Sequence, residues 1–402
     1  KEVRGYWEIS LTRLKEEIAG DAGSIRDEMP ERLKKAYRSD STELYDRLLK
    51  LFTAINDGNP EVNVPFYNGG LFITNPHPDD HSPEAENARF LCSHKIPDRY
   101  LAIGLDLIAR DIDDKTHALA SIDYKSLGVR HLGSIYEGLL EFKLHVASEK
   151  MAVVKGKKTE EVVTYSEAKN NKLTVLTTGR GKNAEERTLK KGTVYLENDK
   201  RERKATGSYY TPDHIVKYIV QNTVGPVLAE KLDALRPKLR EAQQTLKNER
   251  DKYKALGGKG DLPENQTYIK HRHLVDELFD IKVLDPSMGS GHFLVEAVDF
   301  ISDKILGDRE GFLRAFPWNP ITSEMEKTRQ TILNEMEQCG VSVDRNRLTD
   351  VNLLKRHILK RCIYGVDLNP MAVELAKVSL WLDCFTVGAP LSFLDHHLRS
   401  GN

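Results

Sequence analysis

The sequence predicts an α/β fold class, with a parallel sheet in the C-terminal half, a mainly helical N-terminal domain and a small β insert between them. Three observations support this prediction. Apolar residues recur at helical spacing before residue 145, and β-branched runs alternate with turn residues over 150–204. After residue 280, short apolar runs alternate with helical segments, as in strand–helix–strand–helix units. We expect domains at 1–147, 148–205 and 206–402.

Composition excludes several classes of protein. The 402 residues carry 60 Lys and Arg against 61 Asp and Glu, so the net charge is about −1 and no global basic excess indicates a nucleic-acid binder. No apolar run approaches the roughly 18 residues that a membrane span requires. The dispersed cysteines fit neither a disulfide framework nor a zinc site, so a cytoplasmic, reducing location is the default. These cysteines are Cys92, Cys339, Cys362 and Cys384.

The two ends of the sequence carry further expectations. The first four residues are not followed by an apolar segment, so we expect no signal peptide. The chain does not begin with Met, and it ends at Asn402 without a recognisable stopping point. We therefore expect a piece of a longer protein.

The N-terminal domain is predicted from two helical stretches and the loop between them. Residues 56–83 are rich in Pro, Gly and Asn and should be largely loop. The apolar residues at helical spacing are Leu44, Leu48, Leu49, Leu51, Phe52 and Ile55 in the first stretch, and Leu132, Ile135, Tyr136, Leu139, Leu140 and Leu144 in the second.

The insert is predicted to be antiparallel and basic. Strands are expected at 162–165, 173–176 and 193–196, where β-branched and aromatic residues are separated by Lys, Asn and Gly. Over residues 150–204, 15 Lys and Arg face 8 Asp and Glu, a local charge of about +7. This segment is either a solvated hairpin or a basic surface that faces phosphates.

A helix should begin near residue 211. Thr211 can cap it, Pro212 suits the first helical position, and Asp213 favours the positive end of the helix dipole. Apolar residues then follow at spacings of four and three, interrupted by Pro237, so we expect a kink or two abutting helices. Packing on its own domain is favoured over an interchain coiled coil. The apolar residues are Leu228, Leu232, Leu235, Leu239, Ala242 and Leu246.

The α/β part begins at a buried strand over 281–284. A glycine turn and a helix over 292–305 follow it, and a mostly helical insertion should occupy 306–360. A second strand is expected at 362–366 and a helix from residue 369 onwards. The apolar face of that last helix is predicted to carry Leu375, Val378 and Leu382.

The chemistry of the sequence is concentrated where these two strands end. Residues 285–293 (Asp-Pro-Ser-Met-Gly-Ser-Gly-His-Phe) place an acid at a strand end, followed by two glycines that allow close approach to a ligand. The third glycine of the dinucleotide motif is missing, and an acid would repel a pyrophosphate. Asp285 would attract a cationic amine instead, so the residues indicate a ligand such as S-adenosylmethionine.

Asp367 ends the second strand, where a carboxylate can accept both ribose hydroxyls of a nucleoside. The usual separation of the two features is about 20 residues. Here Asp285 and Asp367 are 82 positions apart, and the insertion at 306–360 accounts for the excess. Considered without the glycine turn, Asp367 could equally be an acid that ends a strand and binds no ligand.

Three segments together resemble motifs X, I and II of amino-DNA methyltransferases. They are residues 207–212 (Gly-Ser-Tyr-Tyr-Thr-Pro), 285–291 (Asp-Pro-Ser-Met-Gly-Ser-Gly) and 364–370 (Tyr-Gly-Val-Asp-Leu-Asn-Pro). Their order resembles the gamma group of N6-adenine enzymes, and more narrowly the methylases of type IIG restriction-modification and related phage-defence systems. Residues 68–72 and 132–141 resemble segments upstream of motif X in the same group.

This resemblance implies a Rossmann-like, class I methyltransferase fold, incomplete in this chain, with S-adenosylmethionine as cofactor and double-stranded DNA as substrate. Other restriction or defence subunits are implied partners, and no membrane is involved. The implied cofactor contacts are Tyr210 and Thr211 at the methionine end, Asp285 at the amino group, Gly289 and Gly291 beneath it, Phe293 nearby, Asp367 at the ribose, Leu368 and Asn402 at the adenine, with Tyr209 and Ser287 in the same site.

The transfer step of this family uses an (Asp/Asn/Ser)-Pro-Pro-(Tyr/Phe/Trp) loop around a flipped adenine. The sequence contains no Pro-Pro pair, so the resemblance implies that this motif IV lies beyond Asn402 and that no catalytic residue lies in this chain. The resemblance also implies a target-recognition domain, which would follow motif IV and is absent from these 402 residues. Residues 1–145 show no PD-(D/E)xK-like nuclease signature.

Three alternatives stay open. The first is a non-catalytic DNA-binding or scaffold subunit with a methyltransferase fold. The second is methylation of RNA or of protein glutamine with the same motifs. The third is a zinc hydrolase, because residues 76–81 resemble the zinc loop of certain sugar N-deacetylases; its ligands would be His77, Asp79, Asp80 and His81.

Overall fold

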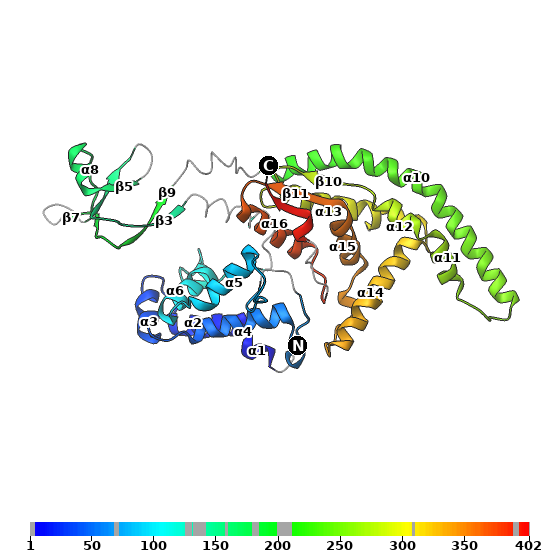
Figure 1. Ribbon diagram of the computed structural model, residues 1–402, viewed down its shortest axis with the longest axis horizontal. Helices are drawn as coiled ribbons and strands as arrows, with labels where there is room; N and C mark the ends of the chain where they lie inside the picture. Colours follow the sequence, from blue (N-terminus) through cyan, green and yellow to red (C-terminus); the bar gives the residue numbers. More distant parts are fainter. Residues whose placement is uncertain are drawn as a thin grey trace.

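Three separate clusters of buried side chains organise the chain in the computed structural model (Figure 1). The structure describes residues 5–67, 72–124, 131, 142–156, 160–178, 185–198, 211–307, 310–388 and 394–401. The fold is mixed α/β, mostly helical, with small sheets that include one parallel three-stranded sheet. In the described part of the chain, no helix is long and apolar enough to cross a membrane.

The N-terminal part is helical, as predicted. Its core includes Ile18, Met29 and Leu33, all almost completely buried. The predicted helix over residues 44–55 is confirmed, and residues 58–82 hold only one short 3-10 helix in their described part. The elements are α1 (Tyr6–Ile9), α2 (Leu11–Ala22), α3 (Met29–Ala36), α4 (Glu43–Asp57), η1 (Pro60–Val62), α5 (Pro83–Ser93), α6 (Asp98–Ala109), and the antiparallel pair β1 (Arg110–Ile112) and β2 (Leu119–Ser121). Most of the second predicted helical stretch, 132–141, lies outside the described residues, and the prediction was wrong for its last residue, because Leu144 lies in strand β3 (Phe142–Val146).

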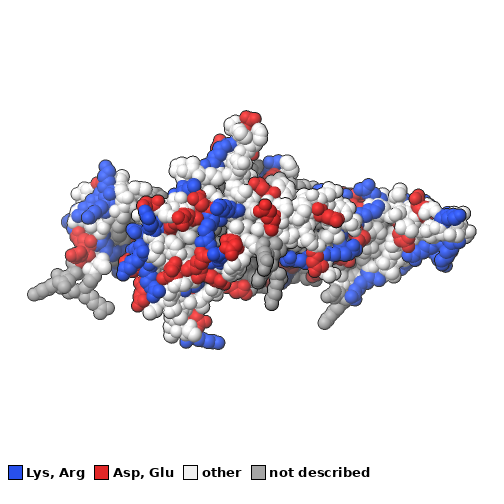
Figure 2. Space-filling view, turned by 90° about the horizontal axis from the view of Figure 1, so that it is seen from below, with Lys and Arg blue, Asp and Glu red and all other residues white. Residues whose placement is uncertain are grey.

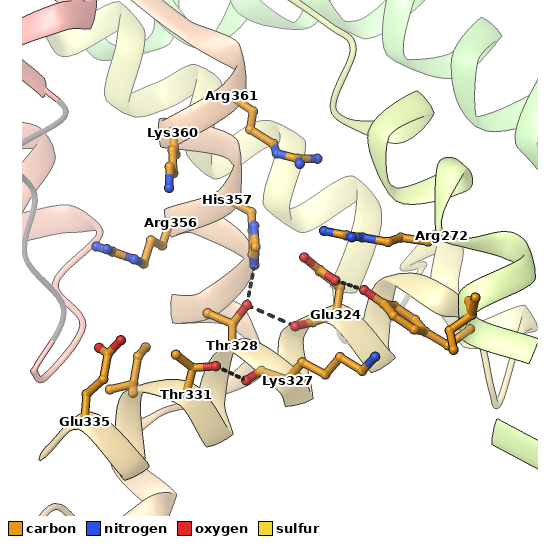
Figure 3. A pocket seen from close by; sticks show the side chains of 13 residues that line it. Arg272, Glu324, Lys327, Thr328, Thr331, Glu335, Arg356, His357, Lys360 and Arg361 are labelled. Carbon is orange, nitrogen blue, oxygen red and sulfur yellow. Dashed lines mark hydrogen bonds between the residues drawn. The ribbon is translucent and has the colours of Figure 1, made fainter. Parts of the chain in front are cut away.

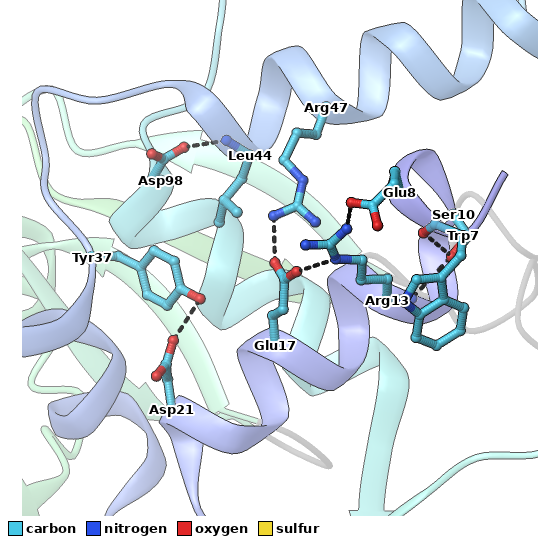
Figure 4. Close-up of polar contacts among 10 residues, drawn as sticks. All are labelled: Trp7, Glu8, Ser10, Arg13, Glu17, Asp21, Tyr37, Leu44, Arg47 and Asp98. Atoms are coloured by element: carbon cyan, nitrogen blue, oxygen red, sulfur yellow. Dashed lines mark hydrogen bonds and ion pairs between the residues drawn. The ribbon is translucent and has the colours of Figure 1, made fainter. Parts of the chain in front are cut away.

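A distant carboxylate caps helix α4. Its own N-cap residue, Thr42, makes no side-chain capping bond. Instead, buried Asp98 of α6 accepts hydrogen bonds from the Leu44 backbone N–H at 2.9 Å and the Glu43 backbone N–H at 3.2 Å. These are two of the amide groups that a helix start leaves without a partner. The bond to Leu44 is drawn in Figure 4.

A second set of polar contacts joins α2 to its neighbours (Figure 4). The Glu17 carboxylate accepts from Arg13 at 2.7 Å and from Arg47 of α4 at 2.5 Å. The bond from Arg47, followed by that from Arg13, lowers the pKa of Glu17 against the opposing effect of burial. The Tyr37 hydroxyl donates to Asp21 at 2.8 Å, so the helical part is held at its surface as well as in its core.

The insert is a set of small antiparallel sheets that extends to one end of the molecule (Figure 1). Two predicted strands are confirmed in part as β5 and β9. The prediction at 173–176 was wrong, because only Val175 forms an isolated bridge, to Val154. The elements are β3 (Phe142–Val146), β4 (Met151–Lys155), β5 (Glu160–Thr164), α8 (Tyr165–Asn170), β6 (Thr177–Thr178), β7 (Glu185–Glu186), β8 (Thr188–Leu189) and β9 (Val194–Asn198).

Strand β4, which the pattern of turns and β-branched runs did not indicate, is the centre of the insert. It pairs with β5 on one side and β8 on the other, and its Ala152 and Val154 form a small core with Ala168. Ion pairs Lys169–Glu186 and Arg187–Glu160, both at 2.8 Å, neutralise part of the local charge. Most of the excess of Lys and Arg falls in segments 157–159, 179–184 and 199–204, which lie outside the described residues.

Helix α10 (Asp213–Ala255) runs 43 residues without a break, although it contains Pro226 and Pro237. The prediction of two abutting helices was therefore wrong, and Figure 1 shows a continuous curve. The apolar seam from Leu228 to Leu246 is buried against helices of the same chain, as predicted. This packing offsets the hydrogen bonds that each proline removes. The neighbouring helices are α11 (Pro263–His271), α12 (His273–Leu278) and α13 (His292–Leu306).

The parallel sheet has the strand order β10-β11-β12, each pair parallel. Helices of the segment between β10 and β11 pack against it and share its core. The elements are β10 (Val283–Asp285), η4 (Phe312–Ala315), α14 (Pro320–Gln338), η5 (Arg345–Arg347), α15 (Asp350–Cys362), β11 (Ile363–Asp367), α16 (Pro370–Asp383), α17 (Leu394–His397) and β12 (Leu398–Ser400).

The predicted apolar face of α16 needs a correction. Leu382 is 48% exposed, whereas Ala372, Val373, Ala376 and Leu380 are buried. Helix α13 and the glycine turn lie close to α16, and at Ala376, which meets the turn at Gly291, little volume is left for a large side chain.

Aromatic packing and one pair of hydrogen bonds join the N-terminal helices to the sheet part. The side-chain amide of Asn63 donates to the Ser342 carbonyl at 3.0 Å and accepts from the Ser342 N–H at 2.7 Å. The Tyr67 ring lies 6.2 Å from Trp381 and 5.5 Å from Phe385. Positive and negative side chains are interspersed over the face drawn in Figure 2, in keeping with the near-zero net charge.

Replacing Asp98 by Ala should lower the free energy of unfolding by about 1–3 kcal/mol, because the Glu43 and Leu44 amides lose their acceptor. Urea unfolding followed by circular dichroism measures this change. Asp40→Ala is the control, because Asp40 is exposed and pairs only with Arg38 beside it. Equal stability of the two variants would contradict the capping role.

Candidate functional site

The candidate site lies where β10 and β11 end. In the parallel ladder, Asp285 stands beside Gly365, and Asp367 follows two residues later on the neighbouring strand. The strand pairing therefore places the two acids at the same edge of the sheet. The turn between β10 and α13 crosses this edge.

Glycines allow the turn to lie directly on the sheet. A Cβ at Gly365 would lie 2.9 Å from the Leu294 side chain and closer still to the Met288 sulfur, so a larger residue would force these two buried side chains to move. Gly291 has φ +82°, a left-handed conformation that favours glycine, and its added Cβ would lie 3.1 Å from that of Ala376. The turn is consequently fixed between β11 and α16.

Backbone hydrogen bonds attach the turn to the end of β11. The Met288 N–H donates to the Val366 carbonyl at 3.0 Å. The Gly289 N–H donates to Asp367 Oδ2 at 2.9 Å, and the Asn369 N–H donates to Asp367 Oδ1 at the same distance. Each carboxylate oxygen retains acceptor capacity after one such bond. Asp367 is thus oriented and can still accept from a ligand.

Asp285 is the electrostatically unfavourable member of the site. Its side chain accepts one hydrogen bond, from the Ser287 N–H at 3.0 Å. Burial raises the pKa of Asp285, and the nearby Asp367 carboxylate raises it further, against the lowering effect of the Ser287 bond. A cation bound beside Asp285 would relieve both effects.

The surface beside the turn is open at Gly289 and apolar at Leu368. An added Cβ at Gly289 would meet no atom within 4 Å, so the turn is open on that side. Leu368, the residue after Asp367, is 65% exposed and offers an apolar surface. Phe293 packs in part against the core, and Ser287 is exposed.

The start of α10 is also tied to the turn, by a contact that the sequence did not reveal. Asp213 Oδ1 lies 3.1 Å from His292 Nε2, which joins the first residue of α10 to the first residue of α13. A bond to Lys217, and secondarily the bond to His292, lowers the pKa of Asp213. Thr211 therefore lies two residues before Asp213, whose contact with His292 joins α10 to the helix that follows the glycine turn. Its predicted capping role was wrong, because Pro212 holds the N-cap position without a side-chain bond.

Three predicted site residues, Tyr209, Tyr210 and Asn402, lie outside the described residues. Gly401, the residue before Asn402, donates its backbone N–H to the Asp367 carbonyl at 3.0 Å. No simple sequence signal could have found Asp213 and His292 as partners, because they are 79 positions apart and each has an ordinary local role.

The alternative zinc loop gains no support. His77 and Asp79 are largely exposed, with His77 Nδ1 3.7 Å from Asp79 Oδ2, and Asp80 accepts from the Ser82 N–H beside it. Within the described ranges, no group of three or more His, Cys, Asp or Glu side chains could hold a metal ion.

Comparison with known proteins gives one relative. Over 182 residues, the chain is 29% identical to a protein of Methanocaldococcus jannaschii named as a candidate type II restriction enzyme and methyltransferase. The matched segment covers 45% of this chain and 12% of the relative. No family model matches the sequence. No solved structure matches it either. The similarity indicates a distant relation to restriction-modification proteins.

Replacing Gly365 by Ala should lower the free energy of unfolding by about 1–3 kcal/mol, because the new methyl group collides with Met288 and Leu294. Gly104→Ala is the matched control: it lies inside α6 with no atom within 4 Å of the added Cβ, and should be neutral or stabilising. Chemical unfolding of both variants measures the change in their free energies of unfolding. Equal tolerance of the two changes would contradict the close contact.

Replacing Asp285 by Asn should stabilise the ligand-free protein at pH 7. The wild-type carboxyl has a raised pKa, so the folded state loses stability as the pH rises from the unfolded-state pKa through the folded-state pKa. Asn has no such loss. The difference in melting temperature should therefore shrink at acidic pH, where Asp285 is protonated. A pH-independent difference would contradict this account.

Proposed function

We propose that this chain binds S-adenosylmethionine at the ends of β10 and β11. It would form the cofactor-binding part of a site-specific DNA adenine methyltransferase in a restriction-modification or phage-defence system. The observation that carries the proposal is the pair of carboxylates on adjacent parallel strands around a glycine turn. The distant relative, a candidate restriction enzyme and methyltransferase, supports the same class of activity.

The strand order supports a Rossmann-like arrangement of the class I type. Counting from β10, the order β12-β11-β10 corresponds to the 3-2-1 half of a doubly wound sheet, whose ligands lie at the carboxyl ends of the strands. Asp285 and Asp367 lie at those ends. The helical N-terminal part and the insert would precede this sheet as separate domains.

The residues present fit the proposed cofactor. The half-buried Asp285 carboxylate suits a cationic amino group, and Asp367 retains lone pairs for two ribose hydroxyls. Exposed Leu368 suits the flat face of an adenine ring, and the open side of Gly289 leaves space above the turn. The bound cofactor would supply a methyl group activated by a positive sulfonium.

The part of these residues is to hold and orient rather than to activate the target base. Methylation of an exocyclic amine also needs a loop that accepts its protons and stacks on the flipped base. No Pro-Pro pair of that kind occurs in the 402 residues. The chain by itself is therefore expected to bind the cofactor without methylating DNA.

Basic segments within 150–204 would contact DNA phosphates, with an affinity that falls as salt is raised.

Calorimetric titration of S-adenosylmethionine into this chain tests the proposal. Loss of a charge-assisted bond should weaken binding about 10- to 100-fold in Asp285→Ala and in Asp367→Ala. Asp251→Ala, an exposed acid on α10, is the control and should bind like the wild type. The affinity should also fall as the pH is lowered through the raised pKa of Asp285.

Absence of binding by the folded wild-type chain, or equal binding by all variants, would overturn the cofactor site. The substrate is tested separately with the product of the complete gene and labelled S-adenosylmethionine. Label recovered as N6-methyladenine in DNA supports the proposal. Binding without any transfer to DNA would favour a non-catalytic subunit or a different methyl acceptor.

A further inference from the structure

A cavity lies beside helix α15, which leads into the amino end of β11. Helix α15 ends at Cys362 and β11 begins at Ile363, so the last turn of α15 lies at the amino end of the strand. Together with α14 and the end of α11, this helix encloses a cavity of about 900 Å³ (Figure 3). That volume is within the range of small-ligand pockets, roughly 300–1,000 Å³.

The walls of this cavity are predominantly basic. Five cationic side chains line it, against the two carboxylates Glu324 and Glu335. The cations come from three separate elements, and in Figure 3 Arg272 and Arg361 extend from opposite walls toward the space that contains His357 and Glu324. They are Arg272 after α11, Lys327 on α14, and Arg356, Lys360 and Arg361 on α15.

Existing contacts neutralise only some of this charge. Arg361 pairs with Asp276 at 2.9 Å. Burial lowers the pKa of Arg356, and the nearby Glu335 carboxylate opposes this effect. Arg272 and Lys360, by contrast, form no ion pair with any residue that the structure describes. Lys327 lies over the Tyr268 ring at 3.4 Å from its centroid, and the Tyr268 hydroxyl donates to Glu324. Cations gathered in a concave surface raise the local concentration of anions.

The remaining lining groups are uncharged at pH 7 and include two isoleucines, two threonines, Tyr268 and His357, and the Tyr268, Thr328 and Thr331 hydroxyls donate hydrogen bonds within the protein. His357 stacks on Phe279 and lies 3.1 Å from the Thr328 hydroxyl. Burial lowers the pKa of His357 to about 4, so the ring is uncharged at pH 7. The cavity therefore combines guanidinium and ammonium groups with hydroxyl and aromatic surface. Phosphate groups suit this combination, because arginine binds their oxygens bidentately and lysine acts as a point charge.

We infer that the cavity between α11, α14 and α15 binds the phosphate group of a small ligand of the nucleotide type. Arg272 and Arg361 extend toward one another across a hollow of limited volume, which favours a small ligand over an extended nucleic-acid backbone. The site is separate from the strand ends that carry Asp285 and Asp367, and the inference does not depend on the proposed cofactor.

Titration calorimetry with ATP, AMP and inorganic phosphate tests the inference on the whole chain. The double variant Arg272→Gln/Lys360→Gln should weaken ATP binding about 10- to 100-fold, since it removes two charge-assisted contacts. Lys254→Gln, an exposed cation on α10, is the matched control and should bind ATP like the wild type. Binding should weaken as salt is raised.

Further measurements distinguish a nucleotide from free phosphate, and the cavity from the proposed cofactor site. Tight binding of ATP or AMP supports a nucleotide, whereas equally tight binding of inorganic phosphate supports a free phosphate at the same residues. Asp285→Ala should leave ATP binding unchanged, and the double variant should leave S-adenosylmethionine binding unchanged. If the double variant is unstable by circular dichroism, Lys360→Gln alone provides the test.

Two results would overturn the inference. One is the absence of ATP, AMP and phosphate binding by the folded wild-type chain, or binding that the double variant retains in full. The other is binding of duplex DNA that depends on Arg272 and Lys360 while the small ligands fail to bind. That result would assign these cations to a nucleic-acid surface.

Discussion

The absence of a side chain at residue 365 is the constraint on which the site depends. Met288 occupies the position that a Cβ on β11 would need, so the turn after β10 lies directly on the neighbouring strand. The Gly289 N–H of this turn donates to Asp367. Burial raises the pKa of Asp285, and the Asp367 carboxylate on the paired strand raises it further. Packing, hydrogen bonding and electrostatics are therefore coupled at the strand ends.

Charged side chains differ between the two ends of the strands in the small sheet. Asp285 and Asp367 lie at the carboxyl ends of β10 and β11, whereas Lys360 and Arg361 precede β11 at its amino end, where Arg361 pairs with Asp276. The overall charge of about −1 does not reveal this arrangement. A composition summed over the chain cannot predict such a distribution, because it depends on which helix ends the fold places beside each edge.

Local pattern predicted the elements that determine the site, and it failed where distant parts of the chain meet. The helix from His292 and the strand ending at Asp367 follow from periodicity and turn residues, and the parallel pairing then brings Asp285 and Asp367 together. The Asp213–His292 contact joins residues whose local roles are already satisfied. Leu382 was assigned to the buried face of α16, but the structure buries Ala372, Val373, Ala376 and Leu380 and leaves Leu382 exposed. Continuity of α10 through Pro237 likewise depends on packing with other helices.

Helix α10 has a mechanical consequence. Its 43 residues correspond to a length of about 65 Å, and its first residue touches the first residue of α13 beside the glycine turn. A tilt of about 5° at that end would displace the other end by about 6 Å. Helix α11 packs back along α10 and leads to Arg272. A rigid rotation of α10 about the end beside the glycine turn would therefore move its far end much further than the turn itself.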